Sequence, residues 1–507
     1  MSDKLFQAAS DVDMIFQAGL MYLDETDAAR PLLAAQPPSQ ANGTWIVNPD
    51  GSMRTRWTLR PNLTWHDGQP LTAADFAFAH AVYTDNEIPV STRLPEALMT
   101  AVTALDPLTV EIDYKQPFVG AASLHTRELS PLPRHLLGDL FAQDKGAFMK
   151  SPFWTSTDYV GSGPYRLTTW ERGVSLTFSP HPGFPLGVPP VDTLRVVFVA
   201  DANTVAARML AGAVDVFPTA TNALAATLKE RWQADRGGEV HIISLKARRL
   251  YFQFRDVPDH QKAVLDPRVR QALVHSIDRV ALSGAVEGGM GSLADTAYPV
   301  GARLYPQVDR VIARYPYDVT RAQALLRDAG WTSGPDGVAR DSTGKTLDVE
   351  VRTTEDQDAS IIADFWKQVG ISPQAVFITG VRRRDDEYRA NFPATQIQAG
   401  SSGYLTNLYT ATAPSPANGF RGSQNRGTYN NPEYNSRYDL QLTTLDPAAR
   451  DQLLVDLERV ITQDLAVGFL TYDAAPVVVR GNVRGVRTVA KELGNALWNI
   501  WEWTVVE

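Results

Sequence analysis

The chain of 507 residues contains no cysteine. This absence excludes disulfide bonds, thiolate nucleophiles and every zinc or iron–sulfur site that needs a cysteine ligand. It does not indicate a compartment, because proteins without cysteine suit both the cytosol and an oxidising envelope. Long hydrophobic runs are missing as well, since no run in the sequence approaches the roughly 20 apolar residues of a membrane-spanning helix.

Excess positive charge is absent too. The 48 lysine and arginine residues are outnumbered by 57 aspartate and glutamate residues, so the formal net charge is -9. Nucleic-acid binding needs a basic surface, and we therefore expect no nucleic-acid partner. Hydrophobic residues make up 44% of the chain, which is typical of a folded globular protein. At about 150 residues per domain, the length predicts about three domains or two large lobes.

Complete catalytic and metal-binding motifs are also lacking. The eight histidines include no pair at the two- or four-residue spacing that brings two imidazoles to one metal ion. Residues 339–346 resemble a phosphate-binding loop, but Ala339 stands at its first glycine and a strand-like pattern follows, so we interpret them as a hairpin turn. Residues 400–403 are one residue short of a serine-hydrolase nucleophile motif. We expect no catalytic residue, no metal ion and no cofactor.

What the sequence does contain is an alternation of helix and strand signals. Capping residues before apolar patterns predict helices from residue 72, from 266 to 288, from 318 to 330 and from 446 to about 465. Runs of β-branched and aromatic residues predict strands at 55–59, 194–199, 240–254 and 347–351, with turns at 48–51 and 335–337. This alternation favours mixed α/β lobes.

The segment 57–76 carries the most information. It reads WTLRPNLTWHDGQPLTAADF, a strand, a turn and a capped helix. This segment resembles the signature of the family 5 extracellular solute-binding proteins, the peptide-binding-protein-like receptors of ABC importers, with Asn62 where the family usually has glycine. Further segments resemble the family pattern in the same order, at residues 159–167, 201–215, 266–279 and 430–435. The series runs from about residue 20 to the C-terminus.

The resemblance implies an α/β fold of two lobes, of the type II periplasmic-binding-protein kind, with an extra subdomain inserted in the N-terminal lobe. We expect the N-terminal lobe to comprise residues 1–45, 163–257 and 478–507, the inserted subdomain residues 46–162, and the C-terminal lobe residues 258–477. In such proteins two lobes close on a ligand. The alternation in residues 498–503 predicts a strand of the N-terminal lobe.

The resemblance also implies where a ligand would bind. Phe254 and Arg255 lie at the first crossing between the lobes, and Arg255 stands where the family often has asparagine. Tyr472 lies near the second crossing, where the family often lines its pocket with tyrosine; packing in the core is the alternative for this residue. The C-terminal tryptophans offer further faces on which a sugar or an apolar ligand could stack.

The specificity segment departs from the family. Peptide-binding members commonly show G-W-x-x-D-Y-x-D-P, in which the first aspartate receives the α-ammonium group of the peptide. Residues 399–407 keep Tyr404 but have glycine or threonine in place of the tryptophan and the acids. We expect Tyr404, Asn407 and Tyr472 to contact the ligand. Because a buried ammonium needs a counter-charge, a peptide ligand would require another acid, such as Asp11 or Asp13.

The resemblance implies a non-enzymatic substrate-binding protein that captures a peptide-sized organic solute and delivers it to the permease subunits of an ABC importer. An oligosaccharide or another non-peptide solute is the first alternative, and a hydrolase on the same scaffold is the second. Nickel is disfavoured by the scattered histidines. We expect a monomer that is periplasmic or extracellular and meets the membrane through its permease. Residues 1–6 show neither the basic nor the apolar region of a leader peptide.

Overall fold

The computed structural model describes residues 12–26, 28–90, 93–235, 237–354, 357–401, 407–421, 424–488 and 496–506. The chain divides into two compact units: unit 1 comprises Met1–His241, Pro476–Val489 and Leu493–Glu507, and unit 2 comprises Ile242–Ala475 and Ala490–Glu492. The strands β12 (Gly238–Phe252) and β19 (Val467–Arg480) each contain a boundary of this division. The lobe boundaries expected at residues 257 and 477 stay predictions.

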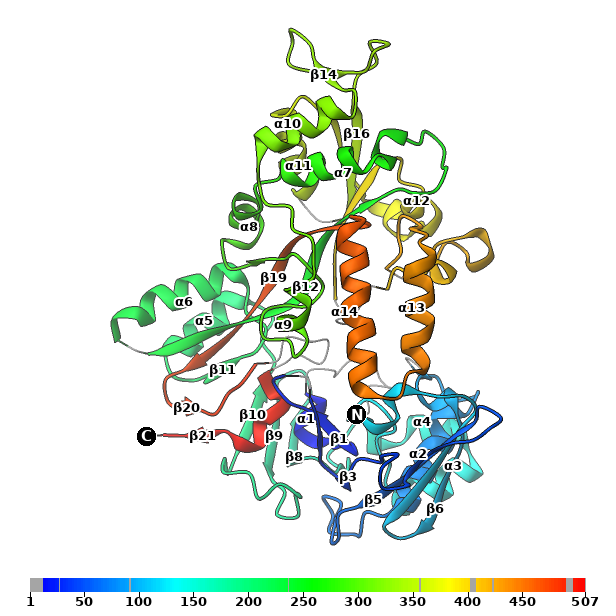
Figure 1. Ribbon diagram of the computed structural model, residues 1–507. Coiled ribbons are helices and arrows are strands. Elements are labelled where there is room, and N and C mark those ends of the chain that lie inside the picture. The colour runs from blue at the N-terminus through cyan, green and yellow to red at the C-terminus, as the bar shows by residue number, and fades with distance from the viewer. Residues whose placement is uncertain are drawn as a thin grey trace. The chain divides into compact units, whose positions relative to one another are not determined.

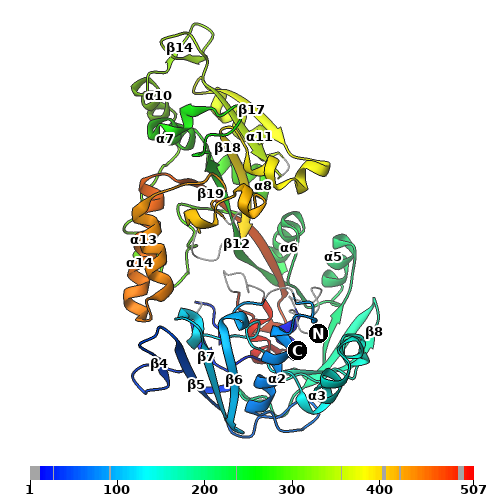
Figure 2. The ribbon, with the colours of Figure 1, turned by 90° about the vertical axis from the view of Figure 1, so that its right-hand side faces the viewer.

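The first sheet of unit 1 has the strand order β3-β5-β7-β6, with β4 beside β5. Its strands are β3 (Ala34–Gln36), β4 (Trp45–Val47), β5 (Met53–Leu59), β6 (Met99–Asp106) and β7 (Thr109–Tyr114). Figure 2 shows β5, β7 and β6 side by side. Alternate residues of β5 are buried, among them Trp57 and Leu59, as the predicted strand requires. Helix α2 (Ala73–Thr84) packs on β6 and β7 and begins at the predicted capping box of Thr72 and Asp75.

Unit 1 contains three smaller sheets and several further helices. The sheets are β1 (Met21–Leu23) with β2 (Ala29–Pro31), β8 (Tyr165–Glu171) with β9 (Ser175–Pro180) and β10 (Leu194–Val197), and β20 (Val483–Arg484) with β21 (Thr504–Val505). The helices are α1 (Asp13–Phe16), α3 (Arg134–Gln143), α4 (Lys145–Lys150), α5 (Ala202–Leu210) and α6 (Asn222–Asp235). The short strand β11 (Val216–Phe217) pairs with the end of β19.

The expected strand at residues 498–503 is wrong. The chain forms a 3-10 helix, η8 (Ala496–Glu502), before β21. Trp498 and Trp501 lie on either side of a kink at Asn499, and both rings contact Tyr22, at centroid distances of 6.1 and 5.2 Å. The alternation of tryptophans was misleading because the intervening residues Asn499 and Ile500 are buried as well.

The main sheet of unit 2 has the strand order β19-β12-β18-β16-β17. Strands β16 (Asp348–Thr353) and β17 (Ser372–Phe377) are parallel, β18 (Thr395–Ser401) is parallel to β16, and β12 is antiparallel to β18. The short strand β13 (Ser292–Leu293) pairs with β19. Strands β14 (Thr332–Ser333) and β15 (Ala339–Arg340) form a separate hairpin. Residues 339–346 form the turn expected from the sequence, since Arg340 pairs with Thr346 and the Gly344 N–H donates to the Asp341 carbonyl at 3.0 Å.

Helices cover both faces of this sheet. They are α7 (Pro267–His275), α8 (Arg279–Glu287), α9 (Tyr305–Val308), α10 (Val319–Asp328), α11 (Asp358–Lys367), α12 (Asp386–Ala390), α13 (Pro432–Thr443) and α14 (Pro447–Gln463). Leu250 and Phe252 of β12 enter a core with residues of α7, α10 and α11. Ala247 and Tyr251 enter the opposite core with residues of α14. Helices α13 and α14 lie side by side (Figure 1).

The single helix expected from residue 266 to 288 is two helices. Asp266 caps α7 as predicted, but α7 ends at His275 and Asp278 begins α8 by accepting hydrogen bonds from the N–H groups of Val280 and Ala281. Asp is a strong N-cap, so it stops one helix and begins the next inside a continuous apolar pattern. Gly288 ends α8 at φ 59°, in the left-handed region that favours glycine.

Gly161 provides a test of close backbone packing in unit 1. A Cβ atom at this position would lie 1.9 Å from the Phe16 carbonyl oxygen, so Gly161→Ala should lower the free energy of unfolding by about 2 kcal/mol or more. The matched control is Gly284→Ala in α8, where a Cβ atom meets nothing within 4 Å and alanine favours the helix. Urea unfolding should show a lower midpoint for the first variant and an equal or higher midpoint for the second. Equal midpoints for the two variants would contradict this packing.

Candidate functional site

Two of the residues expected to bind a ligand, Tyr404 and Asp11, lie outside the described residues. Tyr472 is buried, 3% exposed, and its hydroxyl donates to the Thr296 carbonyl at 2.6 Å. The side-chain oxygen of Asn407 accepts the N–H of Tyr409 at 3.1 Å. Both side chains therefore have partners within unit 2, and their contact with a ligand stays a prediction.

Phe254 and Arg255 follow β12. The Phe254 ring lies 5.4 Å from the ring of Tyr429 and 5.1 Å from the Arg270 guanidinium. Arg255 donates to the Pro414 carbonyl at 2.7 Å and to the side-chain oxygen of Asn391 at 2.6 Å. Burial lowers the pKa of Arg255 from its usual value. These contacts tie the end of β12 to the loops around it, and a ligand role for the pair also stays a prediction.

Unit 1 contains a small hollow with room for about one water molecule. It is far smaller than the roughly 300–1,000 Å³ of small-ligand sites. Tyr22 and Trp498 supply aromatic surface, Asp13 is the alternative acid considered from the sequence, and the complete lining is Asp13, Met14, Tyr22, Leu23, His125, Thr126, Arg127 and Trp498. The hollow thus brings together residues from near both ends of the chain.

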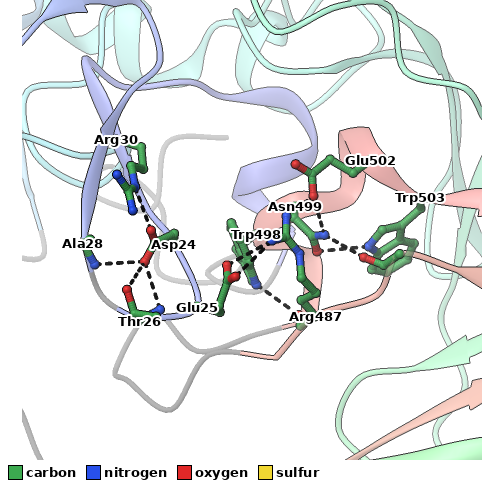
Figure 3. A network of polar contacts seen from close by, with 11 residues as sticks. Asp24, Glu25, Thr26, Ala28, Arg30, Arg487, Trp498, Asn499, Glu502 and Trp503 are labelled. Atoms are coloured by element: carbon green, nitrogen blue, oxygen red, sulfur yellow. Dashed lines mark hydrogen bonds and ion pairs between the residues drawn. The ribbon is translucent and has the colours of Figure 1, made fainter. Parts of the chain in front are cut away.

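A polar network holds the walls of this hollow (Figure 3). Arg487 forms ion pairs with Glu25 at 3.1 Å and with Glu502, and its guanidinium lies 4.8 Å from the Trp498 ring. Trp498 donates through Nε1 to the Arg487 carbonyl at 3.0 Å. The contacts of Arg487 therefore fix the Trp498 ring beside the turn that carries Glu25.

Asp24 stabilises the same turn by accepting hydrogen bonds from residues close to it in sequence. Its carboxylate accepts hydrogen bonds from Thr26, from the N–H of Ala28 and from Arg30, the last at 2.7 Å (Figure 3). Burial alone would raise the pKa of Asp24, but the hydrogen bonds from Thr26 and Arg30 outweigh it and hold the pKa below its usual value. The carboxylate therefore stays charged and keeps the β1–β2 connection in place next to Tyr22.

A buried charge cluster occupies one face of β12 in unit 2. Arg248 contacts three carboxylates: Glu287 at 2.9 Å, Asp473 at 3.0 Å, and Asp358. Burial, with a smaller contribution from Glu287 and Asp358, raises the pKa of Asp473 to about 6 against the opposing effect of Arg248. Sequence analysis missed this cluster, because its members lie on four elements and only folding brings them together.

The opposite face of β12 carries a second polar group. Successive residues of a strand point to opposite faces, so Arg249 lies on the side of Tyr251. Arg249 donates through Nη1 to the Gln424 side chain at 3.0 Å and to the Tyr251 hydroxyl at 3.4 Å. In the register of β12 and β18, Arg249 lies opposite Gln398 and Tyr251 lies opposite Gln396. We call Arg249, Tyr251, Gln396 and Gln398 the polar row.

Several buried atoms of the polar row have no hydrogen-bond partner among the described residues. They are Nε and Nη2 of Arg249, Oε1 of Gln396 and Oε1 of Gln398. Buried polar groups in proteins are nearly always paired, so an unpaired one calls for an explanation such as a bound water, ion or ligand. The row thus offers donors and acceptors from two rigid strands, an arrangement that suits recognition of a polar ligand. Sequence analysis overlooked the polar row because Arg249 and Gln398 are 149 residues apart. A signal was nevertheless present, since Phe254 and Arg255 follow β12 and the expected specificity segment begins within β18.

Metal binding finds no geometric support in the part of the chain that the structure describes, where no three histidine, aspartate or glutamate side chains are placed to hold one ion. Within the same residues, no helix is both long and apolar enough to cross a bilayer.

Asp473 predicts a pH dependence of stability. The pKa of Asp473, about 6, lies above the usual 3.8, so the folded protein binds this proton more tightly than the unfolded chain does. The stability gained from this proton is complete below pH 4 and is lost as the pH rises through 6. Asp473→Asn keeps an acceptor for Arg248 but does not titrate. Its free energy of unfolding should therefore rise relative to wild type between pH 4 and pH 7, by up to about 3 kcal/mol. Urea unfolding across this range measures the difference, and a constant difference would contradict the assignment.

Comparison with known proteins agrees with this fold and with the motifs. The model of bacterial extracellular solute-binding proteins, family 5 Middle, matches residues 31–420. The chain is 28% identical over 463 residues to Protein XP55 of Streptomyces lividans, covering 90% of this chain and 78% of that protein. It is 23% identical over 373 residues to the oligopeptide-binding protein AppA of Bacillus subtilis, covering 72% of this chain and 64% of that protein.

The solved structure of Bacillus subtilis AppA in complex with a nonapeptide superposes with a TM-score of 0.66 at 19% identity, covering 99% of this chain and 95% of that chain. The α/β fold of two lobes expected from the motifs is thereby confirmed as the fold of this chain. The family model covers more than half of the sequence. The chain therefore belongs to the bacterial extracellular solute-binding proteins, family 5, and its function is solute binding.

Proposed function

We propose that this chain captures a peptide-sized organic solute and delivers it to the permease subunits of an ABC importer. The observation that carries the proposal is the polar row of β12 and β18, whose buried donors and acceptors have no partner among the described residues. Family membership supports the transport role, and the relative AppA is an oligopeptide-binding protein.

The peptide-sized solute is supported by the spread of hydrogen-bonding groups. Gln396 and Gln398 lie two residues apart on β18, and strand side chains at this spacing share one face. Their amide groups can each accept and donate a hydrogen bond, as the peptide groups of an extended ligand do. Tyr404, Asn407, Tyr472, Phe254, Arg255 and Asp11 remain the side chains proposed to complete the site.

An oligosaccharide is the second candidate. The specificity segment has glycine or threonine where peptide-binding members have the acids that receive an α-ammonium group, and a neutral solute would need no such acid. We further propose a monomer that meets the membrane through its permease, in keeping with the extracellular family to which the chain belongs.

Ligand-induced stabilisation tests the proposal. The purified chain is heated with a pool of dipeptides to hexapeptides and, separately, with a pool of neutral oligosaccharides. A ligand at about 100 times its Kd adds about 2.7 kcal/mol of stability, so binding should appear as a clear rise in Tm. A rise with the peptide pool supports the main proposal, and a rise with sugars alone supports the second candidate. No rise with either pool contradicts both.

The same samples distinguish binding from hydrolysis. The pool that raises Tm is incubated with the protein, and its members are then identified by mass spectrometry. A binding protein should return every member intact, because it has no reaction to perform on the solute. Loss of a parent mass with appearance of its fragments would instead identify a hydrolase and contradict the proposed transport role.

A further inference from the structure

The adjacent residues Arg248 and Arg249 have opposite electrostatic surroundings. Arg248 lies among three carboxylates on one face of β12. Arg249 is buried more deeply, only 1% exposed, yet no carboxylate of the described residues forms an ion pair with it. A buried guanidinium without a counter-charge is strongly destabilising, so Arg249 lowers the stability of the fold that contains it.

The neighbours of Arg249 are neutral. Its guanidinium contacts the Gln424 amide, the Tyr251 hydroxyl and the ring of Phe469, whose centroid lies at 5.9 Å. A second arginine, Arg426, interacts electrostatically with the same Tyr251, and its pKa is lowered by burial and by Arg389. Asp386 also acts on Arg426, whereas the described hydrogen-bond and ring contacts of Arg249 are all with neutral groups, an arrangement that favours a negative ligand at Arg249.

The unpaired atoms of Arg249 form one edge of the guanidinium. Nη1 is occupied by Gln424 and Tyr251, whereas Nε and Nη2 have no partner among the described residues. The N–H groups of Nε and Nη2 point in parallel from that edge, at the spacing of the two oxygens of a carboxylate. Both atoms are buried in this structure, and no described group pairs with them.

We propose that Arg249 binds a carboxylate or another oxyanion of the solute through this edge, so that the solute is acidic. Gln396 and Gln398, whose Oε1 atoms also have no described partner, accept hydrogen bonds from the part of the solute next to the anion. The inference rests on the proposed function and narrows it to acidic solutes, either peptides with a free carboxylate or sugar acids. The cost of burying Arg249 is then offset when the anion binds.

Arg249→Met tests the inference against a structural role. The matched control is Arg270→Met, because Arg270 is also buried, 7% exposed, in unit 2, and its guanidinium donates to the carbonyls of Val264, Leu265, Asp464 and Leu465. Removal of Arg270 leaves these carbonyls unpaired, so the urea midpoint should fall. Removal of Arg249 relieves an unpaired charge, so its midpoint should stay level or rise.

Binding is measured with two pairs of probes in which one member carries a carboxylate and the other has a neutral group in its place. The first pair is a pool of alanine tripeptides to hexapeptides with a free C-terminal carboxylate and the same pool as C-terminal amides. The second is a galacturonic acid trisaccharide and a galactose trisaccharide. Wild type should bind the acidic member of at least one pair about ten times more tightly or better, since charge-assisted bidentate pairs are strong. Arg249→Met should lose that preference, and Arg249→Lys should keep only part of it.

The outcomes separate this inference from the proposed function. Equal affinity for acidic and neutral members, or an acidic preference that survives in Arg249→Met, overturns the role of Arg249 and leaves solute binding in place. No binding of any probe contradicts the proposed function for these solutes. In that case the urea midpoints still test the role of Arg249. If the midpoint of Arg249→Met falls as far as that of Arg270→Met, Arg249 has a structural role and the inference is overturned.

Discussion

The antiparallel register of β12 and β18 is the constraint on which the chemistry of unit 2 depends. It places Arg249 opposite Gln398 and Tyr251 opposite Gln396, and it sends the side chain of Arg248 to the other face. A shift of the register by one residue would exchange the two faces and bury the wrong arginine beside the carboxylates. The apolar residues of β12 resist such a shift, because Leu250 and Phe252 fill one core while Ala247 and Tyr251 fill the other.

Three buried arginines of unit 2 show how the same side chain serves different purposes. Arg270 is satisfied by backbone carbonyls and joins the start of α7 to the loop after α14. Arg248 is satisfied by acids on α8, α11 and β19 and links these elements electrostatically. Arg249 alone among the three keeps an edge without described partners. Arg248 lacks a described partner at Nε only and has three carboxylates beside it, whereas Arg249 lacks partners at both Nε and Nη2 and forms no ion pair with a described carboxylate.

Capping and turn residues in the sequence predicted those elements whose ends depend on contacts between residues close in sequence. The capping box of Thr72 and Asp75, the Asp266 cap and the turn within residues 339–346 were all readable, because each depends on contacts within a few residues. The expectations failed where tertiary contacts decided the structure. Residues 496–502 form the 3-10 segment η8, in which Trp498 and Trp501 both pack on Tyr22, almost the whole chain away.

The sequence by itself determined the family, the α/β class and the starts of α2, α7, α10 and α14, since ordered motifs and capping residues are local patterns. The segment that we expect to determine specificity begins within β18, but sequence analysis missed the polar row and the Arg248 cluster. Only the tertiary structure distinguished Arg248 from Arg249, because the two residues are identical in type and adjacent in sequence. Their difference comes from Glu287, Asp358 and Asp473, which folding brings to one face of β12 and not to the other.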